Sequence, residues 1–152
     1  KTKSFISEQN SAFLVLYKAI LYGHDAKISA ELKKDLAVHA ETNMYDYFIP
    51  NFTASAILSV ALYDMNKALL GLTAFENYSS NLTTSAQKHT WQNIALPILK
   101  GCLEYLQGNY KKAQAILAPV YLNTKPMGCS DELRSIYPET FHYVKAQLEV
   151  QN

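Results

Sequence analysis

The side chains that could act as metal ligands or catalytic groups are scattered along the chain. The four histidines lie in different segments, at His24, His39, His89 and His142. The sequence contains no H-E-x-x-H, C-x-x-C or G-x-S-x-G motif and no glycine-rich loop of the kind that binds phosphate. His39 falls on an apolar stripe, where a packed histidine is more common than a ligand. We therefore expect no catalytic residue, no metal site and no cofactor.

Cysteine and carboxylate chemistry is equally limited. Cys102 and Cys129 are too few for a disulfide framework or a four-ligand zinc site. Cys102 lies on a stripe that we expect to be buried, and a free buried cysteine packs as a small hydrophobic side chain. A single Cys102–Cys129 disulfide stays open as an alternative, because the helices near the two residues would be neighbours in a stacked array. Glu41, Asp46 and Asp64 lie near expected helix ends, where capping explains them better than acid–base catalysis.

Composition excludes several classes of partner. The 152 residues carry a formal net charge of +1, which disfavours binding to nucleic acid or to an anionic membrane surface. The longest apolar runs are far shorter than the roughly 20 residues that a membrane-spanning helix needs, so we expect no membrane insertion. Only 18% of the residues are charged, against about 25% in an ordinary soluble domain, and 12% are aromatic. We therefore expect part of the surface to contact another protein.

The N-terminal residues bear on localisation. They include no initiator methionine and have the pattern of neither a signal peptide nor a targeting presequence. We expect a mature chain or a fragment of an intracellular protein, in a compartment that the sequence does not identify.

Apolar residues recur at spacings of three and four, which predicts helices with one buried face. We expect seven of them, over residues 7–22, 27–40, 44–63, 66–76, 85–107, 110–122 and 131–150, with Ser130 as the cap of the last. In the second, the stripe of Ile28, Leu32, Leu36 and His39 is predicted to be buried. Pro50 predicts a kink or a late start in the third. The polar segment 76–85 is predicted to be a loop.

The helices repeat in pairs. Gly108-Asn109-Tyr110 aligns with Tyr63-Asp64-Met65, and at the same offset Ala113 aligns with Ala68 and Leu117 with Leu72. Spacings of about 40 to 45 residues are typical of helical hairpins that stack into a solenoid. We expect each alanine to lie where the two helices of a hairpin cross closely. The predicted fold is all-α, a single domain over residues 1–152 with antiparallel hairpins stacked as a short right-handed solenoid.

Two motifs resemble known families. Gly101, Gly108-Asn109-Tyr110, Ala113 and Leu117 have the spacing of the small and aromatic positions of a tetratricopeptide repeat. The segment after Trp91 resembles the C-terminal region of the tetratricopeptide repeat protein 38 family. The shared features are Leu96-Pro97, Gly108-Asn109-Tyr110, Ala118-Pro119, Gly128-Cys129-Ser130 and Arg134.

Family members are longer, so the chain corresponds to their C-terminal part. Phe52 and Ala54 stand where the family tends to carry an acidic residue and a histidine, so no polar role is carried over there. The resemblance implies a superhelical scaffold rather than a reaction.

The resulting hypothesis is a non-catalytic, tetratricopeptide-like scaffold or assembly subunit with a protein partner or within a larger assembly. Tyr45, Tyr47, Phe48 and Phe52 form the candidate interface, because aromatic residues are enriched where proteins meet. One alternative is a helical enzyme or small-ligand-binding protein with a pocket between helices.

Another alternative is a secreted helical bundle with one disulfide. Glycans at Asn77 or Asn81, which begin N-x-S/T tripeptides as Asn51 does, would favour it.

Overall fold

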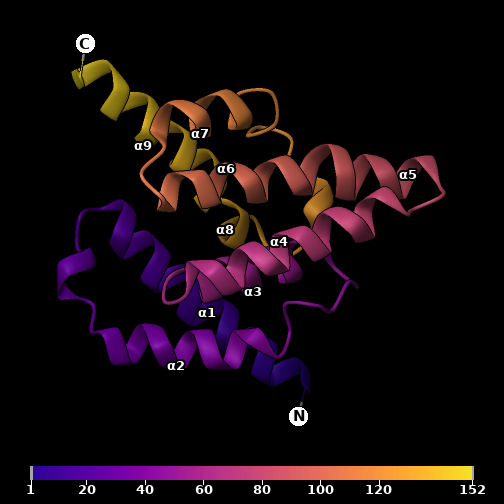
Figure 1. The fold of residues 1–152 in the computed structure, drawn as a ribbon, viewed down its shortest axis with the longest axis horizontal. Coiled ribbons are helices and arrows are strands. Elements are labelled where there is room, and N and C mark those ends of the chain that lie inside the picture. The colour runs from indigo at the N-terminus through magenta and orange to yellow at the C-terminus, as the bar shows by residue number, and fades with distance from the viewer. Residues whose placement is uncertain (1, 152) are drawn as a thin grey trace.

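The protein is a bundle of helices. The computed structural model describes the backbone of residues 2–151 and the side chains of residues 7–151, and this part contains no β-strand. Figure 1 shows α3 near the middle, with α2 below it and α6 and α7 above. The main helices are α1 (Thr2–Leu21), α2 (Ala30–Glu41), α3 (Pro50–Ala61), α4 (Met65–Ser80), α5 (Ser85–Lys88), α6 (Leu96–Leu106), α7 (Tyr110–Leu117), α8 (Asp131–Arg134) and α9 (Ile136–Gln151).

Seven helical segments follow one another in the described residues if α5–α6 and α8–α9 are each counted as one. The all-α prediction is therefore confirmed. A π-helical stretch, His89–Ala95, joins α5 to α6. It lies just before Pro97, which has no N–H for an i−4 bond, and a locally wider helix accommodates that missing donor.

Proline also sets three helix boundaries. α3 begins at Pro50, after Ile49 in an extended conformation. The predicted late start is therefore confirmed, and the predicted start at residue 44 is wrong. The predicted helix 110–122 ends early, at Leu117, because Pro119 cannot continue the hydrogen-bond ladder. The helix predicted over 131–150 is interrupted at Ser135, three residues before Pro138.

The predicted loop over residues 76–85 is wrong in its first half, because α4 continues to Ser80. Tyr78 on this extra turn stacks on Tyr47, with ring centroids 4.2 Å apart, and packs edge-on against Trp91. The hydroxyls of Ser79 and Ser80 bond back to the carbonyl of Glu76. Tertiary ring contacts and local hydroxyl bonds together stabilise a helical turn that has a loop-like composition.

Most of the repeat positions are buried. Ala68 and Ala113 are fully buried, as is Leu117, while Leu72 is partly buried. A Cβ added at Gly101 would lie 2.4 Å from Cγ of Leu117, so α6 and α7 approach each other only because position 101 is glycine. The close approach of α6 and α7 is therefore at Gly101 and Leu117.

Four helices surround the interior. α1 packs against α3 and α9, α3 against α6, and α6 against α9, so that the first and last helices meet. Every residue of the central helix α3 except Phe52 is buried. The helices α2, α4 and α7 lie outside, where α2 packs on α3, α4 on α3 and α6, and α7 on α6 and α9.

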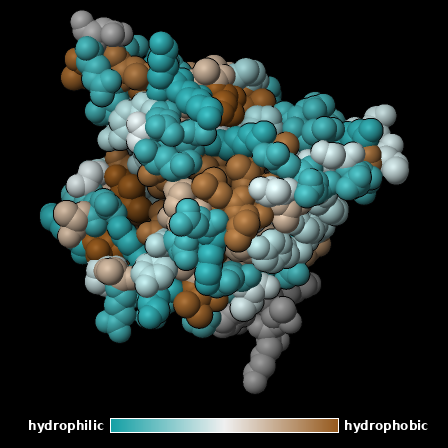
Figure 2. Space-filling view, viewed as in Figure 1, coloured by the Kyte–Doolittle hydropathy of each residue, from teal (hydrophilic) through white to brown (hydrophobic). Residues whose placement is uncertain are grey.

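The surface is not uniformly polar. Figure 2 shows hydrophobic side chains in a hollow near the middle of one face, with hydrophilic side chains around them. None of the described helices is long and apolar enough to span a bilayer.

Candidate functional site

Two hollows flank the middle of α1. The first, which we call the α1 pocket, is a cavity of about 950 Å³ between α1, the segment 43–52 and the segment 129–133. The second, the α1–α2 groove, has a volume of about 540 Å³ and lies between α1 and α2. Ser11 and Val15 line both, so this part of α1 is a ridge between them.

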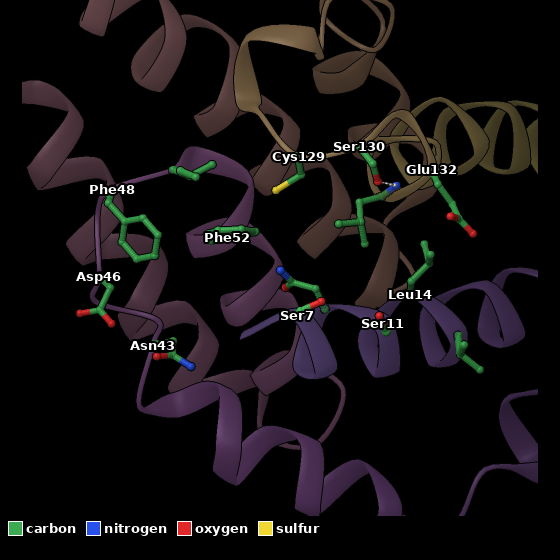
Figure 3. A pocket seen from close by; sticks show the side chains of 14 residues that line it. Ser7, Ser11, Leu14, Asn43, Asp46, Phe48, Phe52, Cys129, Ser130 and Glu132 are labelled. Carbon is green, nitrogen blue, oxygen red and sulfur yellow. Dashed lines mark hydrogen bonds between the residues drawn. The ribbon is translucent and has the colours of Figure 1, made fainter. Parts of the chain in front are cut away.

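Three elements form the walls of the α1 pocket (Figure 3). Ser7, Ser11 and Leu14 come from α1, and Asn43, Asp46 and Phe48 lie on the opposite side, in the segment before α3. The Cys129 thiol, in the segment before α8, points toward the interior of the pocket. The pocket therefore brings together residues that are more than a hundred positions apart in the sequence.

A short turn positions the wall that contains Cys129. Gly128 and Cys129 both have positive φ, 88° and 67°. The Arg134 side chain donates hydrogen bonds to the carbonyls of these two residues and pairs with Asp131. A Cβ at Gly128 would lie 2.8 Å from Cγ2 of Ile49, so glycine also lets this turn approach the opposite wall.

Both cysteines are free thiols in the structure, so the Cys102–Cys129 disulfide is not formed. Burial raises the pKa of Cys102 to about 12, and its side chain is fully buried. Burial also raises the pKa of Cys129, although an Asn51 hydrogen bond and the Arg134 charge act in the opposite direction. Neither thiol is therefore activated as a nucleophile.

The α1–α2 groove exposes apolar side chains. Val15 is 67% exposed and Leu32 is 49% exposed, while Leu36 forms the buried floor. The prediction that Leu32 and His39 are buried is wrong, because α2 packs on α3 through the side that carries Leu36, Ala37 and Ala40. Leu32 and His39 line the groove instead, whereas Ile28 packs against the core.

The four candidate interface aromatics do not form one surface. Tyr47 packs in an aromatic cluster with Phe75, Tyr78 and Trp91. The others are more accessible: Tyr45 is exposed, and Phe48 and Phe52 line the α1 pocket in an edge-on ring pair.

The remaining candidate residues do not assemble into a site. Among the described residues, no three His, Cys, Asp or Glu side chains gather in a way that could hold a metal ion. Of the possible glycosylation residues, Asn51 is buried and accepts a hydrogen bond from Tyr137, whereas Asn77 and Asn81 are exposed.

A set of buried hydrogen bonds was not predicted from the sequence. Tyr17 on α1 pairs with Thr140 on α9, and Asn10 on α1 accepts from the Ser55 hydroxyl on α3. Polar residues within an apolar helical stripe are the only sequence signal for such contacts. Their pairing depends on which helices meet.

Comparison of the chain with protein-family models, curated proteins and solved structures finds no match.

Proposed function

We propose that the protein is a non-catalytic interaction module of tetratricopeptide-like hairpins, and that it binds a helix of a partner protein in the α1–α2 groove. The proposal rests on one observation: in the described structure, no helix covers the amphipathic stripe along the α1–α2 groove. Leu32 on α2 and Val15 on α1 are about half and two-thirds exposed although each lies beside buried core residues.

The rest of the molecule shows how such a surface is covered. Each of the interior helices α3, α6 and α9 packs against the outer helix that precedes it along the chain, which is α2, α4 and α7 respectively. Among the described residues, no helix lies over the groove between α1 and α2. A helix laid into the α1–α2 groove would complete the same arrangement for α1.

The charge around the groove indicates what kind of helix fits. Glu8 and Asp35 lie on its rim, and no lysine or arginine is among the described residues that line it. The α2 residues from Leu32 to His39 span about 10 Å, so a helix of about two turns covers them. The matching partner helix has apolar side chains at i, i+3, i+4 and i+7, with lysine or arginine beside them.

Two synthetic helices test this assignment. Both carry leucine at i, i+3, i+4 and i+7 and a covalent side-chain bridge that keeps them helical; one has lysine beside the leucines and the other has glutamate. We expect the lysine peptide to bind at least about tenfold more tightly in fluorescence anisotropy. Failure of both peptides to bind, or equal affinity for the two, would falsify the proposal.

A pair of variants locates the binding. Leu32→Gln removes an apolar contact from the groove without adding charge. We expect it to lower the affinity for the lysine peptide about tenfold. Val38→Gln is the matched control, because Val38 is 55% exposed on the same helix but does not line the groove. Equal effects of the two substitutions would contradict the assignment.

Sedimentation analysis of the chain alone tests whether a second copy of the chain occupies the groove. A dimer that Leu32→Gln dissociates and Val38→Gln leaves intact would place a second copy in the groove and overturn the partner-helix assignment.

A further inference from the structure

The α1 pocket is a separate site from the α1–α2 groove, on the other side of α1. Its volume of about 950 Å³ lies within the roughly 300–1,000 Å³ typical of small-molecule sites. Its walls combine α1, the segment that leads into α3 and the turn before α8 (Figure 3). A small molecule bound there would touch three elements of the fold at once.

The interior of the pocket is apolar. Leu14 is nearly buried, and Ile49, Phe52 and Leu133 are partly buried around it. Phe48 is 56% exposed, and its ring packs edge-on against that of Phe52, with centroids 5.6 Å apart. An aliphatic chain or an aromatic ring would gain contact with these side chains, and Phe48 is accessible to it.

Among the described residues that line the pocket, the charged side chains all have one sign. Asp46 and Glu132 are exposed and lie at opposite ends of it (Figure 3). No lysine or arginine is among the described residues that line the cavity. The nearby Arg134 is held by Asp131 and by the carbonyls of Gly128 and Cys129. An anionic ligand would therefore meet repulsion, whereas a cation would be attracted to either end.

The buried or partly buried amide side chains of the pocket wall are held by hydrogen bonds to other side chains. Asn10 is 3% exposed, and its side-chain carbonyl already accepts a hydrogen bond from Ser55. Asn43 is likewise held, by Gln9, at 2.9 Å. These contacts fix the amide side chains in place, so the polar part of the wall is pre-organised rather than collapsed into the cavity.

We propose that the α1 pocket binds an apolar molecule that carries a protonated amine. The apolar group lies against Leu14, Phe48 and Phe52, and the ammonium group lies at the end of the pocket that carries Asp46. This inference is independent of the helix-binding function, because Asp46 and Phe48 do not line the α1–α2 groove.

Three probes with one carbon skeleton test the proposal: 4-phenylbutylamine, 4-phenylbutanol and 4-phenylbutyrate. We expect isothermal titration calorimetry to show that affinity decreases in the order amine, alcohol, carboxylate. The amine should bind at least about tenfold more tightly than the carboxylate. Binding of the amine should also slow the reaction of Cys129 with a maleimide, because the thiol points into the cavity.

Variants separate the charge effect from the apolar effect. Asp46→Asn should reduce the preference for amine over alcohol while leaving the affinity for the alcohol unchanged. Phe48→Ala should weaken all three probes. Glu149→Gln is the matched control, since Glu149 is an exposed carboxylate on α9 that does not line the pocket.

Several outcomes would overturn the proposal. They are a carboxylate that binds as tightly as the amine, an amine affinity that Asp46→Asn and Phe48→Ala leave unchanged, and the absence of Cys129 protection at saturating amine. Failure of all three probes to bind at millimolar concentration would also overturn it. Each result leaves the helix-binding proposal to be decided by its own peptides.

Discussion

The side-chain hydroxyl of Tyr17 on α1 lies 2.9 Å from the hydroxyl of Thr140 on α9, and this contact joins the first long helix to the last. Thr140 also donates its single proton to the carbonyl of Ile136, at 2.6 Å, so Tyr17 must be the donor in the pair. Both residues are fully buried. The hydrogen bond therefore helps to close the group of four interior helices.

Removing that donor tests its contribution. Tyr17→Phe should lower the free energy of unfolding by about 1–2 kcal/mol, because Thr140 loses a buried partner that water cannot replace. The measurement is urea denaturation followed by circular dichroism. Tyr22→Phe is the matched control, since Tyr22 is 65% exposed just after the same helix, and it should change stability little. Equal stability of the two variants would show that the contact does not matter.

Glycine at position 101 sets the distance between α6 and α7. Gly101→Ala should destabilise the protein by about 1–3 kcal/mol, because the new methyl group would overlap Leu117. Gly71→Ala should cost much less, since its nearest contacts, to Ile57 and Met44, are 3.2 and 3.3 Å away. In a Leu117→Ala background the Gly101→Ala penalty should shrink, and an unchanged penalty would contradict the steric explanation.

Glu104 should make the stability of the folded protein depend on pH. Burial alone would raise the pKa of Glu104, but hydrogen bonds from Asn109 and Lys112 and the Lys112 charge outweigh it, and the net pKa shift is downward. A lowered folded-state pKa stabilises the protein above the unfolded pKa of about 4.3, and this stabilisation is lost as the pH falls through the folded-state value.

Glu104→Gln should therefore lower stability near pH 7 by about 0.5–1 kcal/mol, because the pair lies near the surface. The difference from the wild type should disappear in acid, below the folded-state pKa. Urea titrations at several pH values measure this. A constant difference from neutral to strongly acidic pH would show that the loss is not electrostatic, and Glu149→Gln serves as the exposed control.

The two cysteines should differ in reactivity. In the native protein at pH 8, a maleimide should label Cys129 and leave Cys102 unmodified, because Cys102 is fully buried and burial raises its pKa to about 12. Mass spectrometry after digestion identifies the labelled residue. The rate at Cys129 should rise further with pH, since burial raises that pKa as well. Fast native labelling of Cys102 would contradict the packing of α6.

Much of the helical structure follows from the sequence alone. Apolar spacing is a local property, and it located seven helices because each needs one buried face. The repeat also led us to expect close helix crossings at Ala68 and Ala113, and both alanines and Leu117 are fully buried. The all-α fold was therefore predictable without knowing which helices meet.

The ends of the helices depended on contacts between distant residues. α4 continues through Tyr78 because that ring stacks on Tyr47, thirty-one positions earlier. No local pattern in a serine- and asparagine-rich segment encodes such a contact. In α2, the stripe containing Leu32 and Leu36 correctly predicted the helix. It did not predict which of these side chains are buried, since burial requires contact with a second surface.

Both hollows were decided by tertiary structure. The α1 pocket exists because Leu14, Asp46 and Cys129, from three distant segments, meet around one cavity. The sequence determined which residues could be apolar, acidic or thiol-bearing, and it correctly predicted helices to carry many of them. Only the packing of α1 against α3 and α9 determined which of them share a wall, because side-chain proximity across a bundle is set by the crossing of helices and not by spacing along the chain.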